Sequence, residues 1–196
     1  MNNPAKQIGI TLLELAIALT ILTVLISMAA PGFGEWISNS KILTLAEGFQ
    51  NGLQLARAEA VRTNNLVFFQ ITNTLTDSCN ATINGTNWVV RRDEADGDCA
   101  TSSTIIQSRA SAEGSTNITV SADCAMLGFD GMGQLIDREE CGLPEDGQFD
   151  FAISAPTGSC ITAGGTLRCR RVVVSLGGQV RICDPAVTTV HDPRRC

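Results

Sequence analysis

The first third of the chain contains two hydrophobic patterns in succession. Between residues 10 and 34, Glu14 is the only charged side chain. The 21 residues at 10–30 would form a helix of about 32 Å at ~1.5 Å per residue, enough for a hydrocarbon core of ~30 Å. Pro31 cannot donate a backbone hydrogen bond and is followed by Gly32 and Gly34, so we expect a kink or local melting there.

After residue 34 the apolar positions recur every three or four residues, which is the period of an amphipathic helix. This pattern predicts a helix over 34–63 that buries one stripe of side chains and is stopped by Asn64 and Asn65. The stripe consists of Ile42, Leu45, Ala46, Phe49, Leu53, Ala56 and Ala60.

Beyond residue 65, short β-branched and aromatic runs alternate with turn residues, which indicates strands. The predicted strands are 66–72, 87–92, 104–108, 117–121, 149–154, 170–176 and 179–183. Gly177 and Gly178, between the last two, predict a hairpin with a two-residue loop. This order of elements predicts an α+β fold, in which a long N-terminal helix packs on a C-terminal antiparallel sheet or sandwich.

The composition argues against an enzyme. The 196 residues carry a net charge of −6 and include one histidine, His191, so His-rich metal sites and Ser–His–Asp triads are not expected. The glycines match neither nucleotide-binding fingerprint. The acidic run at 93–98 lacks the glycine and the bidentate glutamate of a calcium loop. We therefore expect no catalytic residues, no metal and no cofactor.

Glu14 is unusual because an ionised carboxylate inside a membrane costs roughly 2.5–3.5 kcal/mol at the centre of a span. One interpretation is a carboxylate that reaches the nearby membrane interface. The other requires a cation at the same depth. Cleavage between Gly9 and Ile10 would create an α-amino group, and a neighbouring helix would present that group to Glu14.

The segment GITLLELAIALTILTVLISMAAPGF resembles the type III signal of type IV prepilins and pseudopilins. The matching features are a short leader that ends in Gly9, Glu14 fifth in the mature chain, and an apolar helix broken at Pro31. The resemblance implies cleavage after Gly9 by prepilin peptidase and N-methylation of Ile10. It also implies assembly with other major and minor pilins through the apolar helix, in which Glu14 neutralises a neighbour's amino terminus. Ile10 stands where phenylalanine is usual.

Three later segments resemble GspH/FimT-type minor pilins and pseudopilins, a group that includes FimU: LQLARAEAVRTNN, CAMLGFDGMGQL and RRVVVSLGGQVRICDP. The resemblances divide the chain into a leader (1–9), a helix for the inner membrane and the filament core (10–33), its amphipathic continuation (34–63) and a periplasmic domain (64–196). They imply a minor type IV pilin that takes part in filament initiation near the tip. The alternative is a type II secretion pseudopilin that serves protein export.

The charge is unevenly distributed. Residues 77–150 contain fourteen acidic and four basic side chains, whereas residues 168–196 contain six arginines and two aspartates. Three interpretations of this basic end are open: a surface that contacts nucleic-acid phosphates, a docking face for an acidic neighbouring subunit, or a surface that only faces water. FimT-type proteins are associated with DNA capture through a Gly-Arg-x-Arg hairpin, in which Gln179 here replaces the first arginine. The candidate DNA-binding residues are Arg170, Arg171, Arg181, Arg194 and Arg195.

All eight cysteines follow the apolar segment, and none are spaced as Cys-x-x-Cys, which argues against zinc and thioredoxin-like sites. An even number beyond a membrane anchor favours disulfides in an oxidising periplasm. Eight cysteines allow about 105 pairings, which the sequence does not resolve. Our hypothesis is sequential pairing, and the family resemblance implies a C-terminal bridge. The hypothetical pairs are Cys79–Cys99, Cys124–Cys141, Cys160–Cys169 and Cys183–Cys196.

Overall fold

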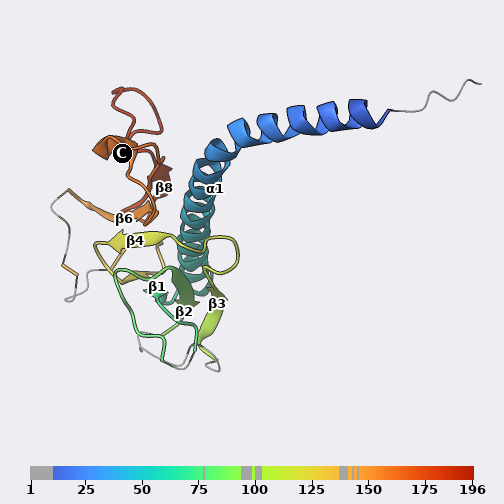
Figure 1. Cartoon of the computed structure of the whole chain (residues 1–196). Helices are drawn as coiled ribbons and strands as arrows, with labels where there is room; N and C mark the ends of the chain where they lie inside the picture. Colours follow the sequence, from blue (N-terminus) through green and yellow to red (C-terminus); the bar gives the residue numbers. More distant parts are fainter. Residues whose placement is uncertain are drawn as a thin grey trace, which may run out of the picture. The chain divides into compact units, whose positions relative to one another are not determined.

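The computed structural model describes residues 11–76, 78–93, 99, 103–136, 141–142, 144 and 146–196. The chain divides into two compact units, Met1–Ile37 and Ser38–Cys196, and helix α1 (Leu12–Thr63) belongs to both (Figure 1). Within the first unit we call residues 12–27 of α1 the stem, and its leucine, isoleucine and valine side chains are all exposed. No helix in the described part of the chain is long and apolar enough to cross a membrane.

The backbone remains helical through Pro31, so the described chain does not show the expected local melting there. A proline removes one intrahelical hydrogen bond and strains the preceding turn. The turns on both sides of Pro31 nevertheless stay helical, and α1 is one element of 52 residues.

The second half of α1 has the predicted amphipathic character. All seven residues of the predicted stripe are buried, and the helix ends at Thr63 as the asparagines indicated. Asn64 takes a left-handed backbone conformation with φ of 50°, and the Asn65 N–H donates to the Ala60 carbonyl at 3.3 Å. Asparagine tolerates this conformation better than most residues, which explains the position of the helix end.

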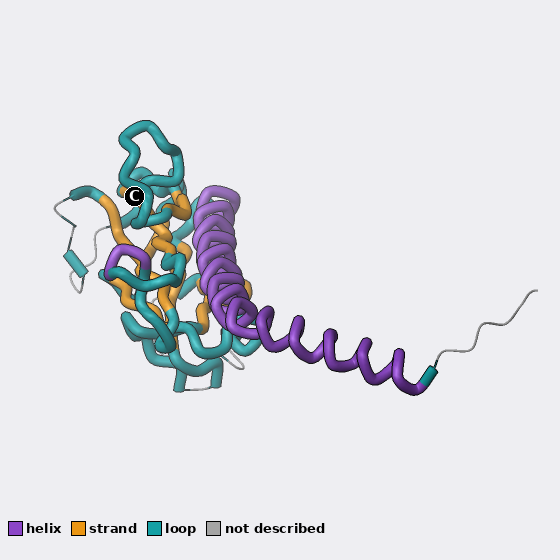
Figure 2. The backbone as a smooth tube through the Cα atoms, turned by 45° about the horizontal axis from the view of Figure 1, so that its top comes forward, coloured by secondary structure: helices purple, strands orange, loops and turns teal. Residues whose placement is uncertain are grey.

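The described strands form two four-stranded antiparallel sheets, and the second half of α1 lies beside them (Figures 1 and 2). The first sheet has the order β3-β2-β1-β5 and the second has the order β4-β6-β7-β8. The strands of the first sheet are β1 (Val67–Thr72), β2 (Asn87–Arg91), β3 (Ile105–Arg109) and β5 (Met126–Phe129). Those of the second are β4 (Thr119–Ala122), β6 (Gln148–Ser154), β7 (Arg170–Ser175) and β8 (Val180–Cys183). A 3-10 turn, η1, covers Ile161–Ala163.

Two details of the sheets differ from the sequence-based prediction. Strand β5 was missed, because its four residues include Gly128 and are too short to show an alternating pattern. The β7–β8 hairpin does not have the predicted two-residue loop. Ser175 N–H donates to Gln179 O at 3.0 Å, and Gly178 N–H donates to Ser175 O at 2.8 Å. The loop therefore has three residues, with Gly178 at φ of 75°, a form that needs glycine only at its last position.

The core lies where α1 meets both sheets. Phe49 of α1 is fully buried, and its ring centroid is 5.7 Å from that of Phe69 in β1 and 5.7 Å from that of Phe151 in β6. Both pairs have edge-on geometry, which aromatic quadrupoles favour. Phe49 thus contacts both sheets, and Phe69 and Phe151 also meet each other edge-on, with ring centroids 6.1 Å apart.

The outer face of the first sheet is also covered. Arg91 and Gln70 are 1% and 0% exposed there, and Arg91 Nη1 donates to Gln70 Oε1 at 3.1 Å. Gln70 Nε2 in turn donates to the Cys79 carbonyl at 2.7 Å, and Arg91 Nε pairs with Asp93 Oδ1 at 2.7 Å. Val89 packs there with the Cys79–Cys99 disulfide. The first disulfide therefore holds a small second core over this face.

Candidate functional site

Glu14 lies in the first turn of α1, and its side chain is exposed. Its N–H donates to Thr11 Oγ1 at 3.2 Å, and the Leu15 N–H donates to the Thr11 carbonyl at 3.1 Å. Thr11 therefore caps the helix, with Glu14 at the third helical position, the sequence spacing of a capping box. A carboxylate is also favourable near the positive end of the helix dipole. The expected processing residues Gly9 and Ile10 lie outside the described residues.

All eight cysteines are paired in the second unit, and the pairs are those of the sequential hypothesis. The Cα–Cα distances are 5.9 Å for Cys79–Cys99, 5.5 Å for Cys124–Cys141, 5.5 Å for Cys160–Cys169 and 5.0 Å for Cys183–Cys196. Each bridge closes a short loop, so it restricts the unfolded chain locally and fixes the segment around it. The last bridge ties the C-terminal tail to the end of β8.

The structure brings the five candidate DNA-binding arginines to one end of the second sheet, but most are engaged within the chain. Three form ion pairs: Arg170 with Asp184, Arg171 with Asp150 and Arg194 with Asp192. Arg181 Nη1 donates to the Arg195 carbonyl at 2.8 Å. Among the described residues, only Arg181 and Arg195 of the five form no ion pair. The cationic footprint is therefore smaller than the sequence indicates.

The carboxylates of two of these pairs differ in their titration. Burial raises the pKa of Asp150 above its ordinary value of 3.8, and this outweighs the opposing attraction of Arg171. Hydrogen bonds from Arg194 lower the pKa of Asp192 to about 2. Asp192 is therefore ionised at any physiological pH, whereas Asp150 is the group in this region whose charge is disfavoured by folding.

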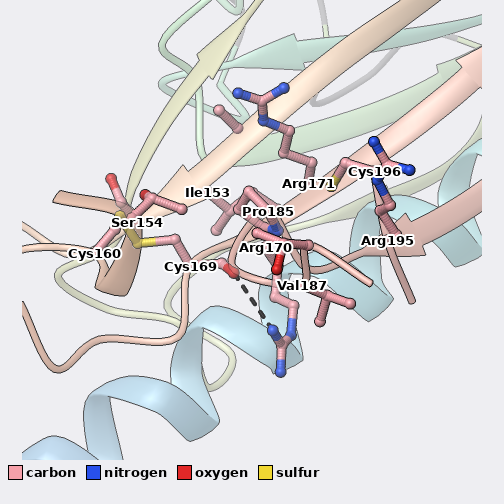
Figure 3. A pocket seen from close by; sticks show the side chains of 13 residues that line it. Ile153, Ser154, Cys160, Cys169, Arg170, Arg171, Pro185, Val187, Arg195 and Cys196 are labelled. Atoms are coloured by element: carbon pink, nitrogen blue, oxygen red, sulfur yellow. Dashed lines mark hydrogen bonds between the residues drawn. A yellow bond between two sulfur atoms is a disulfide. The ribbon is translucent and has the colours of Figure 1, made fainter. Parts of the chain in front are cut away.

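An open groove of about 590 Å³ lies across the ends of β6 and β7 (Figure 3). We call it the C-terminal groove. Its lining residues come from the two strands, the loop closed by Cys160–Cys169 and the tail closed by Cys183–Cys196. They are Ala152, Ile153, Ser154, Cys160, Thr162, Cys169, Arg170, Arg171, Pro185, Val187, Thr188, Arg195 and Cys196. Figure 3 shows the side chains of Arg170 and Arg171 pointing in opposite directions from β7.

Arg57 is a positioning residue that the sequence analysis did not single out. From α1 its Nε donates to the Gly133 carbonyl at 3.0 Å and its Nη2 donates to the Gly177 carbonyl at 3.4 Å. It thereby joins the turn after β5 to the β7–β8 hairpin. A Cβ at Gly178 would lie 1.9 Å from Gly133 O, so the hairpin needs glycine for this close approach. The signal was present, because Arg57 is the arginine of LQLARAEA.

The described residues contain no group of three or more His, Cys, Asp or Glu side chains placed to hold a metal ion. The C-terminal groove is lined by arginines, hydroxyls, apolar side chains and two disulfides. Such a lining can recognise a ligand by its charge and its shape.

Comparison with known proteins gives two family matches. The profile of the family described as Type II transport protein GspH matches residues 45–178, and that of the prokaryotic N-terminal methylation motif matches residues 4–30. No curated protein gives a significant match.

Among solved structures, the type IV minor pilin FimU of Pseudomonas aeruginosa is 19% identical, covering 76% of this chain and 95% of its own, with a TM-score of 0.48. The minor pseudopilin EpsH from the type 2 secretion system of Vibrio cholerae is 12% identical, covering 76% of this chain and 99% of its own, with a TM-score of 0.41.

The GspH match takes in more than half of the chain, from the buried part of α1 to the β7–β8 hairpin. The methylation motif takes in the stem and most of the expected leader. The chain therefore belongs to the family of the type II transport protein GspH and carries the prokaryotic N-terminal methylation motif.

Proposed function

We propose that the chain is a minor pilin subunit that prepilin peptidase cleaves after Gly9 and that takes part in pilus initiation near the filament tip. The methylation motif over residues 4–30 supports this proposal. The exposed stem supports it too, because an extended apolar surface in water marks an interaction site. In the proposal, the stem anchors the subunit in the inner membrane, with the second unit in the periplasm. It then packs against the stems of other major and minor pilins.

Glu14 is the observation that carries the proposal. It is the only charge between residues 10 and 34, and it lies in the first turn of α1. Cleavage after Gly9 would place a new amino terminus at Ile10, four residues before Glu14 in the sequence. In the filament, Glu14 neutralises this group on a neighbouring subunit and so sets the axial register of the stems. A buried pair of this kind contributes more to register than to net stability.

The capping geometry offers a competing explanation, in which Glu14 serves only the start of its own helix. Two variants separate the explanations, because glutamine fills the third position of a capping box as glutamate does and alanine does not. If the charge is needed, Glu14→Gln and Glu14→Ala both lose assembly. If only capping is needed, Glu14→Gln assembles at the wild-type level, and that result refutes the register role. Quantified surface pili and membrane-retained subunit are the measurements.

Processing is tested by intact mass spectrometry of the native polypeptide. The expected mass corresponds to a chain that begins at Ile10 and carries one additional methyl group. A chain that retains residues 1–9 never exposes the amine that Glu14 is proposed to meet. That mass would remove the basis of the filament role.

Assembly into a type II secretion pseudopilus is the second candidate, favoured by the description of the matching family as a type II transport protein. Deletion of the gene separates the two machines. Loss of surface pili with unchanged protein export supports the minor pilin, and loss of export with normal piliation supports the pseudopilin.

A further inference from the structure

We propose that the C-terminal groove is a docking site for an acidic, extended segment of a neighbouring filament subunit. This inference rests on the proposed function, because it requires that the second unit of this chain meets other subunits. It goes beyond that function by naming the surface, the chemistry of the partner and the side chains that recognise it.

The groove is built so that it exists before any partner arrives. The adjacent strands β6 and β7 are paired in register from Gln148↔Ser175 to Ile153↔Arg170. The loop on one side is closed by Cys160–Cys169, and the tail on the other is closed by Cys183–Cys196. Covalently closed walls reduce the conformational entropy that binding would otherwise cost.

The cations of the groove are only partly satisfied within the chain. Arg171 Nη1 pairs with Asp150 Oδ2 at 3.0 Å, and the Arg171 side chain remains 45% exposed. Arg195 is exposed and forms no ion pair with the described residues, while its carbonyl is held by Arg181. Guanidinium groups bind carboxylates through two parallel N–H donors, and each of these two has donors to spare. The hydroxyls of Thr162 and Thr188 add further hydrogen-bonding groups.

Nucleic acid fits this surface less well. Duplex DNA binding draws on about 6–10 phosphate contacts, but three of the five clustered arginines already face aspartates. A cavity of about 590 Å³ accommodates a few residues of extended peptide.

Charge complementarity identifies the occupant. This chain itself has ten more acidic than basic side chains in residues 77–150 and four more basic than acidic ones in residues 168–196. In a helical filament the contacts are heterologous, so a different surface of each neighbour meets the groove. An acidic segment of a neighbouring subunit would be attracted to the arginines of the groove and positioned by them, whereas a basic segment would be repelled.

The test measures fluorescence anisotropy of fluorescein-labelled hexaglutamate with the full processed chain in a neutral detergent. We expect saturable binding that weakens as salt is raised, and no binding of hexalysine. Arg171→Gln with Arg195→Gln should weaken binding by about tenfold or more, because charge-assisted hydrogen bonds are lost. The matched control is Arg168→Gln, an exposed arginine outside the groove whose loss makes half the charge change of the pair. The control should retain at least half of the wild-type affinity.

Three results would overturn the proposal. The first is no saturable hexaglutamate binding by wild-type chain with four intact disulfides. The second is that Arg168→Gln loses as much affinity per charge removed as the double variant does. That result would indicate that binding depends on the general positive charge of this end of the chain and not on the groove. The third is tighter binding of a thymidine hexanucleotide than of hexaglutamate, which would assign the groove to nucleic acid. Processing and piliation are measured separately, so a processed and assembling chain without this binding refutes the groove alone.

Discussion

The junction at Phe49 gives the sharpest prediction about the fold. Phe49 is completely buried and contacts one aromatic ring from each sheet. Among the described residues, Phe49 is the only aromatic side chain of α1 that contacts rings of both β1 and β6. Replacing it with alanine removes both of these ring contacts. The two sheets share this side chain, so the effect should extend to both rather than stay local.

The magnitude follows from this geometry. A buried Phe→Ala change costs about 3–5 kcal/mol, because transfer free energy is lost and a cavity remains. Phe49→Leu keeps most of the apolar volume but loses two edge-on ring pairs worth about 0.5–1.5 kcal/mol each, so we expect about 1–3 kcal/mol. Leu43→Ala, on the same helix at 40% exposure, should cost less than about 1 kcal/mol.

Chemical denaturation of residues 38–196 with the disulfides intact measures these differences, since this region is one compact unit. Trp88 is its only tryptophan, because Trp36 lies outside it, and Trp88 is 2% exposed in the core beside Phe69. Its fluorescence therefore reports unfolding of the site that is perturbed. A loss of less than about 1 kcal/mol for Phe49→Ala, or an equal loss for Leu43→Ala, would refute the shared-core argument.

Three further predictions concern the same unit. Gly52→Ala should destabilise by about 1–2 kcal/mol, because its Cβ would lie 2.7 Å from the nearest atom of the Phe69 ring. In the same denaturation assay Gly48→Ala should be near neutral, because its Cβ would meet the flexible end of Arg109 at 3.1 Å and Trp88 Nε1 at an ordinary 3.7 Å. Replacing both Cys79 and Cys99 by serine should cost about 3 kcal/mol and shorten the half-life in limited proteolysis, whereas an unchanged half-life would contradict the second core. Burial raises the pKa of Asp150, so the folded state binds the Asp150 proton more tightly than the unfolded chain does. The free energy of unfolding should therefore fall as pH rises from 3.8 through the raised pKa. A pH series in which Asp150→Asn shows the same decline would contradict this.

Much of the fold was predictable because its signals are local. The stripe from Ile42 to Ala60 repeats with the helical period, and all of it is buried. Asn64 ends α1 for a reason that lies in its own backbone preference. Strand β5 and the hairpin loop were not predictable in the same way. β5 is four residues long and is defined by its pairing with β1, and the loop is fixed by the approach of Gly178 to Gly133.

The candidate site was predictable only in part. The spacing of Gly9 and Glu14 and the excess of arginines after residue 167 are visible in the sequence. The sequence could not show that Asp150, which is 21 residues before Arg171, would form an ion pair with it, nor that Arg57 would hold two loops from different sheets. Long-range pairs depend on how the strands are ordered, and no local pattern encodes that order.

The sequence by itself determined the apolar stem with its single carboxylate, the amphipathic continuation of the helix and the presence of a cysteine-rich β domain. These follow from residue type and period, which act over one or two turns or a single strand. Only the tertiary structure decided that there are two sheets in the described chain, that Phe49 contacts both of them, and which arginines remain available in the C-terminal groove. The physical reason is that contacts between distant segments depend on which faces are buried together.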